Sequence, residues 1–260
     1  MKCLVLFSGT GSVEKSLLKK MNNLCEIRGL DLDNTFKPFY NVDILEWDYK
    51  KVFEKWVPDY IHGSPVCKEF SNIKHGHQRD LDLGKRLMYK TLEIIEYVKT
   101  INPILLYTIE NPKSNNLRQS GIMEKYNRTT TSYCKYDYPY QKNTDFWFGG
   151  FQLKLEPVCR NTKNENDWCN SKKQYGVHRV RLGVSRGSKT HKLSNDNQLP
   201  DNEYFRELRK QEKYKGYTDQ YFRYRIPESL CDDIVKCVYQ KHICNLVEWL
   251  KKKVEKNKKK

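Results

Sequence analysis

The first 110 residues alternate short apolar runs with stretches in which apolar residues recur at helical spacing. The runs that we interpret as strands cover residues 2–7, 25–33, 39–47, 59–65 and 103–112. Two helices fit between them, with inward-facing positions at Val13, Leu17, Leu18 and Met21 in the first and at Leu87, Thr91, Ile94 or Ile95 and Val98 in the second. Strands alternating with helices predict an α/β fold with a doubly wound, mostly parallel sheet.

After Asn111 the pattern changes. Residues 128–136 and 144–155 are rich in β-branched and aromatic side chains, which predicts a hairpin that closes the sheet. Residues 151–221 are polar, basic and irregular, as is typical of long loops or a small recognition module. A last helix is predicted to begin at Pro227, with an apolar side formed by Ile234, Val238, Ile243, Leu246, Val247 and Leu250.

These changes divide the chain into three predicted parts. Residues 1–150 form an α/β domain and residues 151–225 a small basic module. Residues 226–260 form a helix that docks back onto the first domain and carries a lysine-rich tail.

Net charge is unevenly distributed along the chain. The total formal charge is +16, and the net values are +4 for residues 1–150, +8 for 151–225, −2 for 226–250 and +6 for the last ten residues. Such a field attracts polyanions, so nucleic acid is the leading expected partner and an anionic membrane surface the weaker one. Nine cysteines, without an export signal or a long apolar run, favour an intracellular protein with free thiols and no membrane span.

A glycine-containing turn follows the first predicted strand. Gly9 and Gly11 lie where an open α/β sheet binds a ligand at its carboxyl edge, and Asp31 at the end of the second strand could accept hydrogen bonds from ribose hydroxyls. No third glycine stands at the dinucleotide spacing and no Lys-Ser/Thr follows, so the expected cofactor is a nucleoside without a pyrophosphate. Asp43 could accept from an adenine amino group, although an isolated aspartate there is more often a helix cap.

Six short segments occur in the order of a known motif series. They read "FSGTGS", "GLDLD", "VDIL", "GSPVCKEFS", "TIENP" and "SYCKYDYPYQKNTDFW". In this order the chain resembles the C5 DNA cytosine methyltransferases, and it looks most like their short virus-encoded branch. The similarity covers roughly residues 3–150, with a fainter echo in "RYRIPESL". It implies a class I methyltransferase fold, a Rossmann-like and mostly parallel sheet with a small irregular recognition module.

The resemblance implies S-adenosylmethionine as the cofactor. The residues that would bind it are Phe7, Ser8, Gly9, Thr10, Gly11, Asp31, Leu32, Asp43, Ile44, Pro65 and Leu87. The implied partner is double-stranded DNA, and we expect a monomer.

Cys67 stands at the position of the family's nucleophile. Cytosine C5 is too weak a nucleophile to attack a methyl sulfonium, so a thiolate first adds to C6 and creates an enamine at C5. Glu110 would protonate N3, which requires a carboxylic acid that keeps its proton in a closed pocket. Lys142 completes the implied catalytic set, and the residues expected to bind substrate are Ser64, Ser71, Asn111 and Gln141.

The target base has to leave the duplex stack to reach such a pocket, at a cost of a few kcal/mol. We expect the basic surface to offset this cost and the loop over residues 72–84 to close over the flipped base.

Two further hypotheses remain open. The family usually has proline where Val66 stands and arginines where Asn143 and Asp145 stand, so the chain could be a DNA-binding protein that has lost turnover. The same scaffold also resembles transfer-RNA cytosine methyltransferases, which would make RNA the substrate.

Metal ligands are sparse in the sequence. Cys159, Cys169, His178 and His191 lie in the irregular basic module, where a zinc ion would add most to stability. They contain no paired C-x-x-C, and scattered residues of this kind are usually structural or exposed. We therefore expect no metal site.

Overall fold

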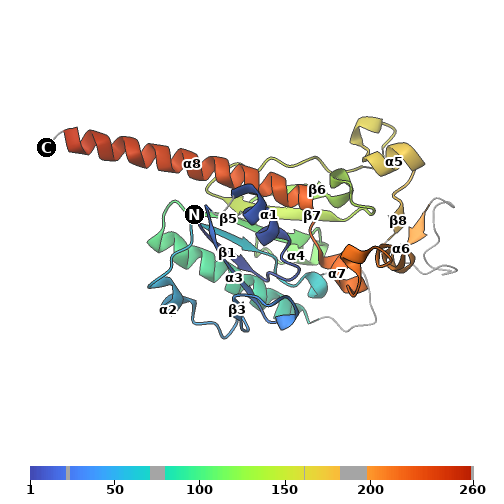
Figure 1. The fold of residues 1–260 in the computed structure, drawn as a ribbon, viewed down its shortest axis with the longest axis horizontal. Helices are drawn as coiled ribbons and strands as arrows, with labels where there is room; N and C mark the ends of the chain where they lie inside the picture. Colours follow the sequence, from blue (N-terminus) through green and yellow to red (C-terminus); the bar gives the residue numbers. More distant parts are fainter. Residues whose placement is uncertain (22–23, 71–79, 161, 182–197, 259–260) are drawn as a thin grey trace.

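The computed structural model describes residues 1–21, 24–70, 80–160, 162–181 and 198–258. One seven-stranded sheet organises this part of the chain, in the order β3-β2-β1-β4-β5-β7-β6 (Figure 1). Only β7 runs against its neighbours β5 and β6, and the other pairings are parallel. The strands are β1 (Lys2–Leu6), β2 (Glu26–Asp31), β3 (Tyr40–Asn41), β4 (Tyr60–Gly63), β5 (Leu106–Pro112), β6 (Asn127–Ser132) and β7 (Asn143–Gly149). The predicted mostly parallel α/β sheet is confirmed.

Helices cover both faces of the sheet. The α-helices of the described residues are α1 (Ser12–Met21), α2 (Tyr49–Phe53), α3 (Leu81–Ile101), α4 (Asn115–Gln119), α5 (Asn170–Tyr175), α6 (Asp201–Leu208), α7 (Asp219–Tyr224) and α8 (Glu228–Lys258). Figure 1 shows α1 and α8 on one face and α2 and α3 on the other. Each face has its own buried cluster: one includes Leu17, Tyr60, Phe146, Leu230 and Ile234, and the other Ile44, Phe53, Ile61, Leu92 and Ile95.

The strand register brings three chain segments to one edge of the sheet. Leu6 of β1 lies opposite Gly63 of β4, which in turn lies opposite Ile109 of β5. The backbone N–H of Ser64 donates to the carbonyl of Leu6 over 3.2 Å. The glycine turn after β1, the Cys67 segment after β4 and Glu110 in β5 therefore share this edge, where parallel α/β sheets bind ligands.

Two predicted boundaries were wrong. The third strand spans only Tyr40–Asn41, because the Asp43 side chain accepts from the backbone N–H of Leu45 and turns the chain. The loop expected over residues 72–84 ends before Leu81, where α3 begins. Asp80 caps this helix by accepting from the N–H of Leu83 over 2.8 Å. The rest of that predicted loop, residues 72–79, lies outside the described residues.

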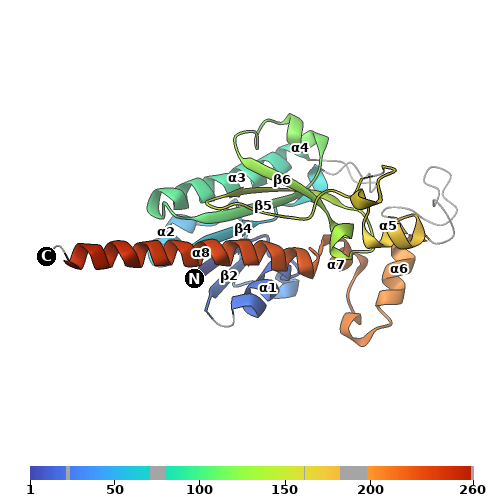
Figure 2. The same cartoon turned by 90° about the horizontal axis from the view of Figure 1, so that it is seen from above.

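The last helix docks with only its first half. Leu230, Ile234 and Val238 are buried, and α8 packs against α1. The second half extends past the sheet (Figures 1 and 2), and the remaining residues of the predicted apolar side are 39–52% exposed, namely Ile243, Leu246, Val247 and Leu250. For this half the prediction of burial was wrong, because the sheet and α1 end before the helix does.

Residues 151–225 contain little regular structure among those described. Besides α5, α6 and α7 they include β8 (Val180–Arg181) and β9 (Leu199–Pro200), which form a separate two-stranded parallel pair. Phe205 and Phe222 belong to the same buried cluster as the α1 and α8 face of the sheet. The boundary at residue 150 stays a prediction, and the two regions share one core. Among the described helices, none has a stretch long and apolar enough to cross a membrane.

Candidate active site

The turn after β1 is held in an unusual backbone conformation. Phe7 has a φ of 58°, Gly9 of 48° and Gly11 of 67°. A positive φ is costly for a phenylalanine and is found mainly where a functional site constrains the chain. Asp31 fixes the turn, because its carboxylate accepts from the N–H of Gly9 over 2.8 Å and from the N–H of Asp33 over 2.9 Å. One bond per oxygen leaves lone pairs on Asp31 for further donors.

The other residues expected at the cofactor edge differ in accessibility. Leu32 is 70% exposed directly after Asp31, and an apolar side chain of this kind suits the face of a planar base. Ile44, Pro65 and Leu87 are buried. Asp43 is partly buried and caps its own turn, the role expected as the alternative to adenine recognition.

Hydrogen bonds within the turn and to β2 hold the turn in place. Thr10 is buried and its hydroxyl lies 2.8 Å from that of Ser12. The backbone N–H of Ser8 donates to the carbonyl of Leu30 over 3.0 Å, which joins the turn to β2. The turn is therefore anchored by backbone bonds from Ser8 and Gly9, while its side chains remain small.

Glu14 lies behind this turn as a partly buried residue whose Oε2 is buried, and it was not identified from the sequence. Its Oε2 has no hydrogen-bond partner among the described residues, and Ser8 is a hydrogen-bond neighbour of the side chain. Burial raises the pKa of Glu14 to about 7, and the negative charge of Asp31 adds to the rise. Gly29 packs closely against this side chain, because a Cβ at that position would stand 3.0 Å from Glu14 Oε1 and 3.1 Å from Ser8.

Cys67 opens a short 3₁₀ turn (Cys67–Glu69) after β4 and is partly buried. Burial raises the pKa of its thiol, Glu110 raises it further, and the positive charge of Lys142 opposes the rise. The three predicted catalytic side chains are thus close enough to influence one another electrostatically.

Glu110 is buried and held at both carboxylate oxygens. The hydroxyl of Tyr133 donates to Oε1 over 2.9 Å and that of Ser64 donates to Oε2 over 3.1 Å. Tyr133 also places its ring 4.7 Å from the Lys142 ammonium, a cation–π contact. Tyr133 therefore links the predicted acid to the predicted cation, and the sequence analysis missed it.

A buried hydrogen-bond chain continues from Glu110 into the sheet. His62 Nε2 lies 3.3 Å from Ser64 Oγ, and His62 Nδ1 lies 2.8 Å from Thr108 Oγ1, which is 2.6 Å from the hydroxyl of Tyr60. Because the Ser64 hydroxyl donates to Glu110, Ser64 Oγ accepts from Nε2–H and leaves Nδ1 as an acceptor. Burial lowers the pKa of His62 to about 3, so the imidazole is neutral. The chain orients Ser64 and, through it, Glu110.

Asn111 supports the segment that carries Cys67. Its Nδ2 donates to the carbonyl of Pro65 over 2.8 Å. Its Oδ1 is buried and has no partner among the described residues. Ser71, which was also expected at the substrate site, lies outside the described residues.

Gln141, Asn143 and Asp145 make local contacts. Gln141 Nε2 donates to the carbonyl of Cys159 over 2.7 Å, and Asn143 Oδ1 accepts from the Ser132 hydroxyl over 2.5 Å. Asp145 is fully buried in β7 and accepts two bonds from the Arg118 guanidinium, of 3.0 and 2.7 Å. The two positions that differ from the family pattern therefore have structural partners of their own.

Helix α7 returns to the same edge of the sheet. Burial raises the pKa of Tyr224, and the charge of a Cys67 thiolate raises it further, so Tyr224 lies near Cys67. Tyr221 places its ring 6.0 Å from that of Phe36, in the turn that follows β2. The fainter similarity in "RYRIPESL" was the sequence signal for this return, and Tyr224 was not identified from it.

The sequence is similar to those of two methyltransferases. A probable DNA (cytosine-5)-methyltransferase of Frog virus 3 is 30% identical over 160 residues, which are 56% of this chain and 70% of that protein. The chain belongs to the DNA (cytosine-5)-methyltransferase family. The type II methyltransferase M.HindV of Haemophilus influenzae is 27% identical over 132 residues, 47% of this chain and 42% of the longer bacterial enzyme. No protein-family model matches the sequence.

A solved structure supports the predicted fold. A methyltransferase of Entamoeba histolytica superposes with a TM-score of 0.50 at 14% identity, covering 95% of this chain and 98% of that one. With the observed strand order, this likeness confirms the predicted class I methyltransferase fold of this DNA (cytosine-5)-methyltransferase family member.

Proposed function

We propose that the chain transfers a methyl group from S-adenosylmethionine to C5 of a cytosine in DNA, with Cys67 as nucleophile. The observation that carries the proposal is the convergence of Cys67, Glu110 and Lys142 at the sheet edge beside the glycine turn. Family membership supplies the reaction class, since the named relatives are cytosine-5 or type II methyltransferases.

The residues at the carboxyl edge fit S-adenosylmethionine. Asp31 keeps free lone pairs for the ribose hydroxyls, and Leu32 offers an exposed apolar side chain to the adenine. The turn from Phe7 to Gly11, with its positive φ angles, would hold the methionine part. When bound, the cofactor supplies an electrophilic methyl group on a sulfonium.

Cys67 begins the reaction by adding to C6 of the flipped cytosine. Its thiol first gives up a proton, and this step is favoured by the Lys142 charge and opposed by burial and by Glu110. The new S–C6 bond places electron density on C5. C5 would then take the methyl group of the bound cofactor, and the sulfur would keep the electron pair of the broken S–CH₃ bond and leave as a neutral thioether. Loss of the C5 proton to a base and departure of the Cys67 thiolate restore the aromatic ring.

Glu110 holds and activates the pyrimidine. The Tyr133 and Ser64 hydroxyls fix its two oxygens. In the proposed reaction this carboxyl group passes a proton to N3 and accepts from the exocyclic amine. Protonation of N3 makes C6 more electrophilic. The buried Oδ1 of Asn111 offers one more acceptor beside the Cys67 turn.

DNA is the substrate that the charge and the relatives favour. The basic excess lies in residues 151–225 and in the last ten residues, and it would contact phosphates without regard to sequence. We assign target selection to the 151–225 region, because it adjoins Lys142 through the Gln141 bond to Cys159.

The partners of Asn143 and Asp145 argue against the hypothesis of lost turnover. Asp145 is neutralised by Arg118, so its charge does not repel a phosphate or compete with Glu110. Asn143 closes the hairpin through Ser132. Lys142 alone of this segment then supplies the positive charge near Cys67.

A methyl-transfer assay tests the proposal. The full chain is incubated with S-adenosylmethionine labelled in its methyl group and with duplex DNA, and the digested nucleosides are separated. We expect label in 5-methylcytosine, its loss in Cys67→Ser and full retention in Cys244→Ser, an exposed position on α8. Cofactor and DNA binding without label on any sequence would support the silent protein, and label only in transfer RNA would move the substrate to RNA.

A further inference from the structure

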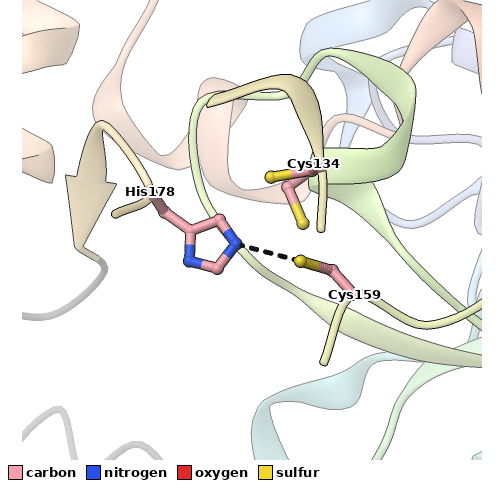
Figure 3. A group of neighbouring side chains, drawn as sticks. Cys134, Cys159 and His178 are labelled. Atoms are coloured by element: carbon pink, nitrogen blue, oxygen red, sulfur yellow. Dashed lines mark hydrogen bonds between the residues drawn. The ribbon is translucent and has the colours of Figure 1, made fainter. Parts of the chain in front are cut away.

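Three cysteines and one histidine converge beside the hairpin, away from the proposed nucleophile. Figure 3 shows Cys134, Cys159 and His178 pointing toward one another. With Cys169 they place one ligand atom each within 4.8 Å of all the others. Cys159 Sγ lies 3.5 Å from His178 Nε2.

These distances suit a single tetrahedral metal ion. With Zn–S of about 2.3 Å and Zn–N of about 2.0 Å, tetrahedral ligands stand roughly 3.5 Å apart for sulfur and nitrogen and roughly 3.8 Å for two sulfurs. The Cys159 to His178 separation already has this value, and the widest pair would draw in by about 1 Å. An iron–sulfur cluster would need a wider set, because its ligands bind different iron atoms.

The four residues come from four separate segments. Cys134 lies in the 3₁₀ turn Tyr133–Tyr136 after β6, Cys159 in the chain beyond β7, Cys169 directly before α5, and His178 before β8. Their sequence spacing of 25, 10 and 9 residues contains no C-x-x-C, which explains why the sequence analysis expected no metal. Of the four candidate ligands named from the sequence, Cys159, Cys169 and His178 belong to the observed cluster. The fourth, His191, lies outside the described residues.

The surroundings favour a metal over an apolar contact. Among the described residues, the buried cluster formed here consists of Cys134, Cys159 and Cys169, without an aliphatic or aromatic member. All nine cysteines are free thiols, so no disulfide holds these segments. A small loop-rich region without its own apolar core is where a metal ion contributes most to folding.

We propose that Cys134, Cys159, Cys169 and His178 bind one structural Zn²⁺ ion. Zinc takes sulfur and imidazole ligands in this geometry, and four protein ligands leave no open position for catalysis. Three thiolates and a neutral imidazole leave the site with one negative charge. Lys172 is buried one helical turn after Cys169, and its positive charge would partly neutralise that negative charge.

The ion would join the basic module to the catalytic sheet. Cys134 follows Tyr133, which holds Glu110, and the carbonyl of Cys159 accepts from Gln141, the neighbour of Lys142. The zinc site would thus fix the module at a set distance from the proposed catalytic residues.

Metal content measured on the full chain tests the site. Protein purified from zinc-supplemented cells is dialysed against metal-free buffer and analysed by elemental mass spectrometry. We expect one zinc per chain, and near-complete loss in Cys134→Ser, Cys159→Ser and Cys169→Ser. Cys237→Ser, a partly buried thiol on α8, serves as the matched control and should keep the ion.

A second measurement covers variants that do not fold. The wild-type chain is stripped by a chelator and titrated with Co²⁺, which reports thiolate ligands by near-ultraviolet charge-transfer bands and tetrahedral geometry by visible d–d bands. Both band types at one equivalent, reversed by Zn²⁺, would support the site. A folded wild-type chain without zinc and without these bands would overturn it, as would zinc that persists in all three cysteine variants, or iron in its place.

Discussion

Replacing Glu14 by glutamine tests the electrostatics behind the glycine turn. The unfolded chain ionises this carboxyl around its ordinary pKa of 4.5, whereas in the folded chain it keeps its proton until about pH 7. Between pH 4.5 and pH 7, folding therefore takes up a proton at Glu14. The contribution of Glu14 to the free energy of unfolding falls as pH rises through this range and is constant above it. This difference in the pKa of Glu14 between the folded and the unfolded chain lowers the free energy of unfolding by about 3 kcal/mol at pH 8.

The variant Glu14→Gln keeps the shape of the protonated acid and cannot ionise. Its amide meets the same surroundings at every pH, including the position of Oε2, which has no partner among the described residues, so the cost of placing the amide there is constant. The variant should therefore gain stability relative to the wild type as pH rises from 5 to 8, by about 2.5 kcal/mol.

Urea unfolding followed by far-ultraviolet circular dichroism at several pH values measures this gain. Glu54→Gln, an exposed carboxyl after α2, is the matched control and should show a constant difference from the wild type. A constant difference for Glu14→Gln as well, within about 0.5 kcal/mol, would refute the reasoning, because it would mean that Glu14 titrates alike in both states.

Two further variants test the hairpin and the nucleophile. Among the described residues, Arg118→Ala leaves the buried carboxylate of Asp145 with only the Thr130 hydroxyl as a side-chain donor. The free energy of unfolding should therefore fall by about 3 kcal/mol in a urea titration, and an unchanged midpoint would contradict the pairing. Lys142→Met removes the charge that lowers the pKa of Cys67. Alkylation of Cys67 by iodoacetamide at pH 8, measured by peptide mass spectrometry, should therefore slow roughly threefold. An equal rate in the variant and the wild type would contradict an electrostatic effect of Lys142 on the thiol.

The sheet and the residues at its carboxyl edge were predictable from the sequence. Buried parallel strands have apolar runs in their sequence, and the residues that follow such strands meet at one edge. The strand pattern predicted that edge for Gly9 and Asp31, and the family resemblance added Cys67 and Glu110. Boundaries were less accurate where a side chain rather than a pattern decides them, as Asp43 does for β3 and Asp80 for α3.

The contacts between distant segments could not be predicted. Tyr133 reaches Glu110 across 23 positions and His62 reaches Thr108 across 46. No periodicity in the sequence encodes such pairs, because they depend on how the hairpin and the strands meet. The Cys134, Cys159, Cys169 and His178 cluster is of the same kind.

The trapping of a covalent intermediate tests the central claim most directly. Duplex DNA containing 5-fluorocytosine is incubated with the full chain and S-adenosylmethionine, then denatured and digested for peptide mapping. Fluorine at C5 cannot be removed as a proton is, so the thioether to C6 persists. We predict an adduct on the peptide that contains Cys67, absent in Cys67→Ser and strongly reduced in Glu110→Gln. An adduct on another cysteine, or methyl transfer that persists in Cys67→Ser, would contradict the account.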